Sequence, residues 1–184
     1  MNFLAHLWLT DRASLPLAGA ILGDVVRGPL PAAMPEPLAQ SVQLHRRVDA
    51  HTDRHPRMVE ARATFPAGAR RYAGIVLDVV LDHALAMDWP RYSGEALAAF
   101  CARAAREVAA EGRWFEHSGA PAPEAQPFSL LLQSYATEEG IERALARVAR
   151  RMRRPEGLLD ASRGWPALLP RAREDLPVLL EHLR

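Results

Sequence analysis

One stretch in the middle of the chain reads Ile75-Val76-Leu77-Asp78-Val79-Val80-Leu81-Asp82-His83-Ala84-Leu85. It belongs to a longer apolar segment, Ala69–Met87, whose spacing is helical and which predicts a central helix buried on most sides. Asp78 and Asp82 are four residues apart, so both carboxylates lie on one face of that helix. Buried acid pairs occur mainly where a metal, a proton or a fixed ion pair compensates their charge. We therefore expect a functional site on this face.

The apolar spacing is helical along nearly all of the remaining chain, and no convincing pair of alternating strands is present. Proline-rich segments interrupt it at Pro29–Pro37 and His117–Pro127. The sequence predicts an all-α, single-domain helical bundle over residues 1–184. The other expected helices are Phe3–Leu9, Leu15–Val26, Leu38–His55, Met58–Thr64, Glu95–Phe115, Phe128–Tyr135, Glu138–Arg153 and Pro170–Leu183.

The composition is that of an ordinary globular protein, with 49% hydrophobic and 24% charged residues. The single cysteine, Cys101, excludes an internal disulfide and favours a reducing compartment. The apolar start of the chain lacks the basic segment and cleavage site of a signal peptide, and no run is long enough to span a bilayer. A net charge of +1 gives no basic field for nucleic acid. We expect a soluble cytoplasmic protein with no nucleic-acid or membrane partner.

A second polar column lies in the segment His45-Arg46-Arg47-Val48-Asp49-Ala50-His51-Thr52-Asp53. His45, Asp49 and Asp53 repeat every fourth residue, so on a helix they form one column. Facing the Asp78 and Asp82 column inside a bundle, it would form a pocket for a divalent metal. Each column alone is also compatible with a solvated helix face. Oxygen ligands with one or two imidazoles suit Mn²⁺ or Mg²⁺ better than structural zinc.

Two further side chains are candidates on local grounds. Asp24 is a lone carboxylate in the apolar run before Arg27-Gly28, where ligation of a metal and an ion pair with a neighbouring arginine are equally open. A single histidine such as His45 is usually a satisfied core residue, but Asp49 one turn later favours ligation. Four other histidines lack a carboxylate one helical turn away in an apolar segment, and we expect them on the surface. These are His51, His55, His117 and His182.

Four linked motifs resemble those of the acyl carrier protein phosphodiesterases, also called acyl carrier protein hydrolases, in the family's order and spacing. The resemblance is tight over the first half of the chain and limited to helical character in the second half. The motifs are Met1-Asn2-Phe3-Leu4-Ala5-His6-Leu7, Gly23-Asp24-x-x-Arg27-Gly28, His45-Arg46-Arg47-Val48-Asp49-x-x-Thr52-Asp53 and Leu77-Asp78-x-x-x-Asp82-His83.

The resemblance implies an all-helical, HD-domain-like fold, distantly similar to the HD-type phosphohydrolases. It also implies a Mn²⁺-dependent hydrolysis, with Mg²⁺ or another divalent metal as alternatives, that removes 4′-phosphopantetheine from the serine of holo acyl carrier protein. The substrate would then be a small acidic protein. One departure limits the HD comparison. His45 is followed by Arg46, and the only adjacent pair of this kind is the reversed Asp82-His83, so HD ligand roles cannot be copied one for one.

With this activity, the expected mechanism is attack of a metal-activated water on phosphorus. Asp49 is expected to orient or deprotonate the water, and Asp53 to share that part or to support the ligands. Arg27 and Arg46 are expected to bind the phosphodiester through paired hydrogen bonds. The metal ligands expected are Asp24, His45, Asp78, Asp82 and His83.

Three questions stay open in the sequence. His6 is equally compatible with completing the site and with burial against Leu4 and Leu7. The same ligands would also serve an HD-like phosphohydrolase acting on a nucleotide or another small phosphodiester. A third hypothesis is that the protein is a helical binding module without enzymatic activity, in which the acidic residues form structural ion pairs with arginine.

Overall fold

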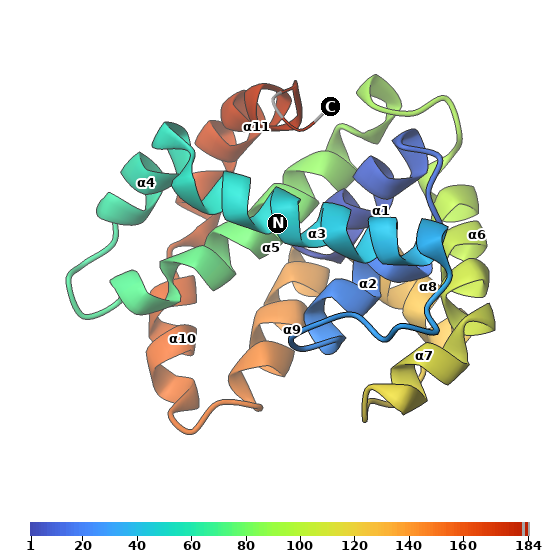
Figure 1. Ribbon diagram of the computed structural model, residues 1–184. Coiled ribbons are helices and arrows are strands. Elements are labelled where there is room, and N and C mark those ends of the chain that lie inside the picture. Colours follow the sequence, from blue (N-terminus) through green and yellow to red (C-terminus); the bar gives the residue numbers. More distant parts are fainter. Residues whose placement is uncertain (182, 184) are drawn as a thin grey trace.

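The computed structural model describes residues 1–181 and 183, and within them every regular element is a helix (Figure 1). The all-α prediction is confirmed. The first half holds α1 (Phe3–Arg12), α2 (Ala18–Val25), α3 (Glu36–Arg54), α4 (Pro56–Ala63), α5 (Arg70–Met87) and the 3₁₀ turn η1 (Trp89–Arg91). The second half holds α6 (Leu97–Ala110), α7 (Gly112–His117), α8 (Ala125–Ser134), α9 (Glu138–Ala149), α10 (Pro155–Ser162) and α11 (Trp165–Glu181).

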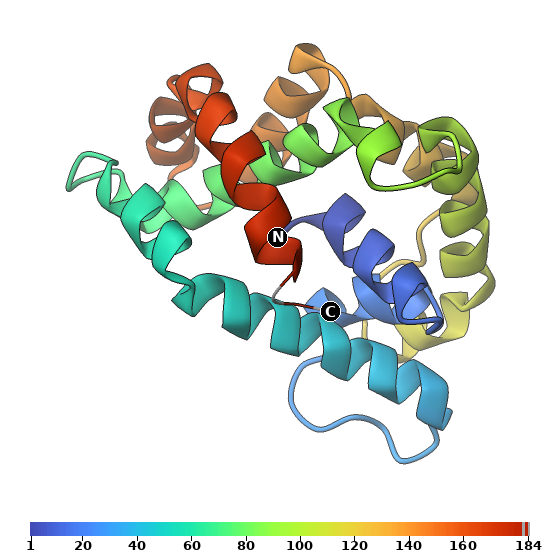
Figure 2. The same cartoon turned by 90° about the horizontal axis from the view of Figure 1, so that it is seen from above.

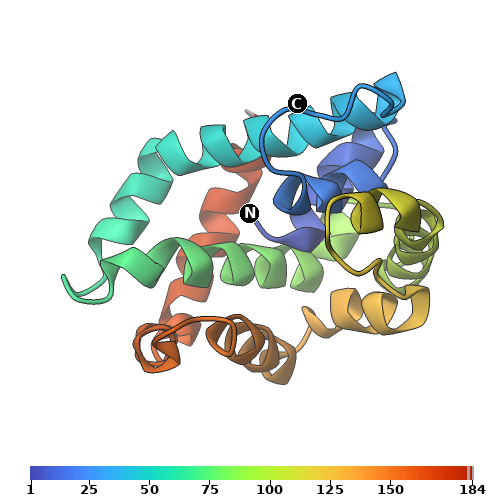
Figure 3. The same cartoon turned by 60° about the horizontal axis from the view of Figure 1, so that its bottom comes forward.

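The predicted central helix, α5, runs through the middle of the molecule. Helices α2, α3 and α4 lie on one side of it and α8, α9 and α10 on the other, as Figures 2 and 3 show from two directions. Helix α11 packs along α5, and α1 lies between α5 and the layer formed by α2 and α3. Asp82 and His83 are buried within α5 among its valines and leucines. Each such buried aliphatic side chain contributes roughly 1.5–3 kcal/mol, so the apolar run fixes α5 in the core.

Helices α2 and α3 approach each other closely because α2 carries glycine where they meet. A Cβ atom at Gly19 would lie 2.2 Å from Ser41 Oγ, and one at Gly23 would lie 2.2 Å from ring atoms of His45. Only glycine leaves room for the facing side chain at such a distance. This contact places the His45 ring beside the C-terminal end of α2, next to Asp24.

Helix boundaries depart from the predicted ones at several prolines. Helix α3 begins at Glu36 instead of Leu38, because Pro37 lies in its first turn, where the missing N–H is not needed. Pro56 ends α3 as expected, and it then opens α4. Helix α11 begins at Trp165 and continues through Pro170 and Pro177, both of which lie inside it.

Two segments of the second half differ from the prediction. The expected helix Glu95–Phe115 is interrupted near Glu111 and forms α6 and α7. Helix α10 was not predicted, because its eight residues follow a run of arginines and contain Gly157. Gly157 packs against Tyr72 of α5, where a Cβ would lie 2.4 Å from the tyrosine hydroxyl oxygen. Tertiary packing therefore favours a helix that its local sequence signals only weakly.

Candidate metal centre

Helices α1 and α3 bring two histidines and one aspartate together. His6 of α1 and His45 and Asp49 of α3 each offer a ligand atom, and these atoms lie within 4.8 Å of one another. His6 Nε2 is 2.9 Å from Asp49 Oδ1, and His45 Nε2 is 3.1 Å from Asp49 Oδ2. Both imidazoles are buried, whereas the Asp49 side chain is 41% exposed. The cluster is thus held in the core on one side and reaches solvent on the other.

The orientation of His45 is set by a backbone carbonyl. Its Nδ1 lies 2.7 Å from the carbonyl oxygen of Ala20 in α2, so Nδ1 carries the proton and donates it. The other nitrogen, Nε2, then points toward Asp49 and toward Asp24, whose Oδ1 is 3.4 Å away. Metal-ligating histidines have this arrangement, in which one ring nitrogen donates to a carbonyl and the other is presented to the ion.

His6 stacks on His45, with ring centroids 3.9 Å apart and planes at 21°. Its Nε2 also lies 3.1 Å from the carbonyl oxygen of Met1. Its buried Nδ1 makes no hydrogen bond within the part of the chain that the structure describes. A buried ring nitrogen without a partner costs free energy unless something compensates it. The nitrogen of His6 that faces the cluster is Nε2, so two imidazole Nε2 atoms and one carboxylate converge there, a donor set that suits a divalent metal.

The charges in the cluster are strongly coupled. Burial opposes a positive charge on His45, but its hydrogen bonds to Asp24 and Asp49 outweigh burial and raise its pKa to about 9. Burial opposes the negative charge of Asp49, yet hydrogen bonds from His45 and His6 hold its pKa well below the usual range. Burial lowers the pKa of His6. A cation at the centre of the cluster is therefore favoured, whether a proton or a metal supplies it.

Asp78 approaches the same cluster from α5. The α-amino group of Met1 lies 3.0 Å from Asp78 Oδ1 and 3.7 Å from Asp49 Oδ1. Burial disfavours the charged amine, but the two carboxylates, Asp78 first, raise its pKa above the ordinary value. The two predicted polar columns thus meet at this amine, and Asp78 supports Asp49 through it.

Three of the predicted site residues, Asp53, Asp82 and His83, have partners unconnected with the cluster. Asp82, a residue of α5, is buried against the start of α1. Its carboxylate accepts hydrogen bonds there from the backbone N–H groups of Leu4 (2.7 Å) and Ala5 (3.1 Å). His83 Nδ1 donates to the carbonyl oxygen of Tyr135, 2.6 Å away. Asp53 is 69% exposed and its Oδ1 lies 2.9 Å from Arg62 Nη2. Although Asp53 is one helical turn from Asp49, its partner is Arg62 of α4 and not a residue of the cluster.

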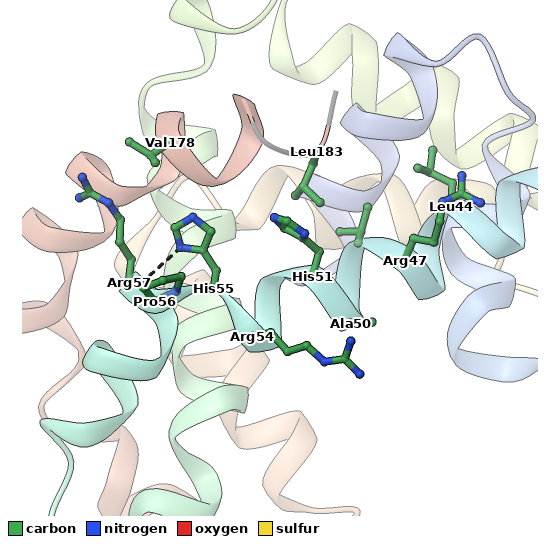
Figure 4. Close-up of a pocket in the computed structure, with 11 residues that line it drawn as sticks. Leu44, Arg47, Ala50, His51, Arg54, His55, Pro56, Arg57, Val178 and Leu183 are labelled. Carbon is green, nitrogen blue, oxygen red and sulfur yellow. Dashed lines mark hydrogen bonds between the residues drawn. The ribbon is translucent and has the colours of Figure 1, made fainter.

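The histidines expected on the surface have the following positions. His51 and His117 are exposed and His55 is half-buried, capping α4 by accepting the N–H of Arg57. His182 lies outside the described residues. Figure 4 shows His51, His55 and Arg57 pointing toward Val178 and Leu183 in a cavity of about 860 Å³ between α3 and the C-terminal part of α11. This cavity shares no lining residue with the cluster.

The two predicted phosphate-binding arginines lie near the open side of the cluster. Arg46 Nη2 donates to the carbonyl oxygen of Val26, at 2.7 Å, and so ties α3 to the end of α2. Arg27 and Asp24 both line a second cavity, of about 600 Å³. The sequence left His6 undecided between a functional site and the core, and the structure shows it buried and stacked on His45 within the cluster. The contact of the Met1 α-amino group with Asp49 and Asp78 was not predicted, because no sequence pattern indicates it.

A family model described as acyl carrier protein phosphodiesterase matches residues 1–172. The chain belongs to this family. Among curated members, the acyl carrier protein phosphodiesterase of Salmonella dublin is 43% identical over 110 residues, which is 59% of this chain and 57% of that protein. The Photorhabdus laumondii protein of the same name is 41% identical over 97 residues, 50% of this chain and 49% of that protein. That of Escherichia coli is 43% identical over 93 residues, 50% of this chain and 48% of that protein.

The chain spans about half the length of the curated family members it matches. No solved structure matches it, so the HD-like part of the fold prediction stays a prediction. Within the described residues no helix is both long enough and apolar enough to cross a bilayer.

Proposed function

We propose that the protein is a metal-dependent phosphodiesterase that hydrolyses the bond between 4′-phosphopantetheine and serine in holo acyl carrier protein. The products would be the apo carrier protein and 4′-phosphopantetheine. Family membership and the names of the family members support the reaction. The observation that carries the metal dependence is the cluster of His6, His45 and Asp49, with His45 Nε2 presented to the carboxylates by the Ala20 carbonyl.

His6, His45 and Asp49 would hold the metal, with Asp24 at its open side. Mixed imidazole and carboxylate donors suit Mn²⁺, and other divalent ions of similar preference. When bound, such an ion supplies a water of lowered pKa and neutralises the charge that grows on the phosphoryl oxygens. The two imidazoles are buried, whereas Asp49 and Asp24 are partly exposed, so a substrate can approach from the side of the carboxylates.

The protein's own side chains have distinct parts in this proposal. Both Asp49 oxygens are engaged by imidazole nitrogens, so Asp49 holds the two rings in register and supports ligation. Asp24 is 55% exposed, and it can accept a hydrogen bond from the attacking water and orient it. Arg27 and Arg46 supply guanidinium groups near the open side, which match the paired oxygens of a phosphodiester. Asp53, Asp82 and His83 have no part in it.

Mass spectrometry of holo acyl carrier protein tests the reaction. The carrier is incubated with the purified protein and Mn²⁺, or with EDTA in place of the metal. We expect a mass loss of one 4′-phosphopantetheine with Mn²⁺ and none with EDTA. Unchanged carrier under both conditions would reject the proposal.

Metal content gives a readout separate from activity. We expect His45→Gln to lose the bound Mn²⁺ found by elemental analysis of the purified protein, and to lose activity with it. The matched control is His51→Gln, on the same helix but outside the cluster, which should keep both. Equal metal content in His45→Gln and the wild type would place the ion elsewhere.

A further inference from the structure

A cavity of about 600 Å³ opens directly beside the cluster. It lies between the segment that follows α2 and the C-terminal end of α7, which are neighbours in Figure 3. Asp24 belongs both to this cavity and to the surroundings of His45 Nε2. Pockets of this size are typical of small-molecule ligands. A substrate whose phosphorus lies at the cluster therefore has room to continue into this cavity.

The charged groups around the cavity favour an anion. Arg27 lines one wall and His117 the other, and neither forms an ion pair within residues 1–181 and 183. The guanidinium of Arg46 lies against Val26, which also lines the cavity. The single acidic group in the lining is Asp24, which faces His45. Guanidinium and imidazole N–H groups are suitable donors to phosphate oxygens.

The cavity walls are conformationally restricted. Pro29 and Pro31 fix the backbone of one wall, and Gly119, at φ +75°, makes the turn of the other. The N–H of Met34 donates to the Pro31 carbonyl, at 2.9 Å, and closes a turn in the first wall. A preformed cavity loses less conformational entropy when it binds a ligand than a flexible loop does.

We propose that this cavity binds the phosphate end and the adjoining polar arm of the substrate, with Arg27 and His117 as phosphate-binding residues on opposite walls. The ligand class is a phosphate ester that carries an extended polar, amide-containing chain. The assignment rests on the proposed function, because it places the 4′-phosphopantetheine part of the substrate beside the cluster, where the bond between phosphorus and the serine oxygen would be broken. The larger cavity between α3 and α11 is not lined by Asp24, the carboxylate that links the smaller cavity to His45, and its lining combines basic with aliphatic side chains.

Binding of free 4′-phosphopantetheine tests the assignment without catalysis. Its dissociation constant is measured by calorimetry for the Mn²⁺-loaded wild type and for Arg27→Gln and His117→Gln. We expect about tenfold weaker binding for each variant, because each removes one hydrogen bond to a charged phosphate. Pantetheine, which lacks the phosphate, should bind more weakly than 4′-phosphopantetheine and show no difference between these variants and the wild type.

Two controls separate this cavity from its alternatives. Arg113→Gln removes a guanidinium from α7 that is 70% exposed and lies 3.7 Å from Glu111, and it should bind the probe like the wild type. His51→Gln changes the larger cavity and should also bind like the wild type. If His51→Gln weakens binding while His117→Gln does not, the arm occupies the larger cavity and the assignment is wrong.

The binding and cleavage experiments distinguish a failure of the cavity assignment from a failure of the proposed reaction. Phosphate-dependent binding that requires Arg27 and His117, without cleavage of holo acyl carrier protein, would support the cavity assignment and reject the reaction. Cleavage of the carrier with unchanged KM and unchanged probe affinity in both variants would support the reaction and reject the cavity assignment.

Discussion

The imidazole rings of His6 and His45 stack at a centroid distance of 3.9 Å, although one comes from α1 and the other from α3. A single carboxylate, that of Asp49, contacts the Nε2 atoms of both rings. Two buried imidazoles this close would repel each other if both were charged; Asp49 compensates a cation on either ring, and Asp24 adds a second carboxylate beside His45. Asp49 therefore links the two rings.

Replacing Asp49 should abolish the site. We expect Asp49→Asn to lower metal affinity and kcat/KM by at least about 100-fold, since removing a supporting partner of a ligand alone costs about 10–100-fold. Asp53→Asn should change kcat/KM by less than about threefold, because Asp53 is on the surface beside Arg62. Elemental analysis and steady-state kinetics on both variants check this. Equal losses in the two variants would restore the role that the sequence gave to Asp53.

Adding a methyl group at Gly23 should also disturb the site, because Gly23 contacts the ring of His45. A Cβ at position 23 would lie 2.2 Å from the His45 ring, so Gly23→Ala must displace either that ring or α2. We expect a loss of roughly 1–3 kcal/mol in unfolding free energy from overpacking, together with weaker metal binding. Urea unfolding and metal titration measure the two effects.

Gly74→Ala is the matched control, because Gly74 also lies within a helix but a Cβ added there would have nothing within 4 Å. It should raise the unfolding free energy by about 0.5–1 kcal/mol, the cost of glycine in a helix interior, and leave metal binding unchanged. If Gly23→Ala behaved like Gly74→Ala, the close approach of α2 and α3 would not position His45.

Much of this site follows from sequence because it depends on spacing within single helices. The repeat of four residues placed His45 and Asp49 on one face of α3, and the apolar run identified α5 as the central helix. What spacing does not give is the meeting of separate helices. Nothing local distinguishes Asp78, which reaches the cluster through the Met1 amine, from Asp82 on the same face, which accepts the N–H groups that begin α1.

The second half of the chain shows the same limit. His117 lies in a segment of prolines and glycine, and only the packing of α7 near the end of α2 brings it to the cavity that Asp24 lines. Helix α10 is stabilised by contacts with α5 and α9, not by a signal in its own residues. Such long-range contacts carry no periodic pattern in the sequence.

The buried carboxylate of Asp82 should give the folding stability a recognisable pH dependence. Burial raises its pKa to about 7, although hydrogen bonds from Leu4 and Ala5 act in the opposite direction. A raised pKa means that the folded state binds the proton more tightly than the unfolded state. The stability that this proton contributes is complete below about pH 4 and is lost as the pH rises to about 7, with a slope of up to about 1.4 kcal/mol per pH unit.

Comparison with Asp82→Asn isolates this group, because the other titrations cancel in the difference. We expect the variant to be less stable than the wild type near pH 4.5, and this deficit to shrink between pH 4.5 and 8 in urea unfolding. The corresponding change at an exposed carboxylate, Asp160→Asn, should change the unfolding free energy by less than about 0.5 kcal/mol. A deficit that grows with pH would mean that the two N–H donors outweigh burial.

The exposed side of α3 should guide an acidic protein substrate to the site. Arg47 and Arg54 lie seven residues apart on the helix that carries His45 and Asp49, and so on nearly the same face. Charge complementarity of this kind acts mainly on the association rate and weakens as salt screens it. We expect the double variant Arg47→Glu, Arg54→Glu to lower kcat/KM for holo acyl carrier protein about tenfold at low ionic strength, and less at high ionic strength.

Arg150→Glu with Arg151→Glu makes the same change in charge at the end of α9, which lies across α5 from α3 in Figures 2 and 3. Because the net charge of the two double variants is equal, a general charge effect would lower kcat/KM equally in both. A local docking effect lowers it only for the pair on α3. Measurements of kcat/KM against salt concentration, with free 4′-phosphopantetheine affinity as the check that the site is intact, decide between these. A loss confined to the α9 pair would place the docking surface on the opposite layer.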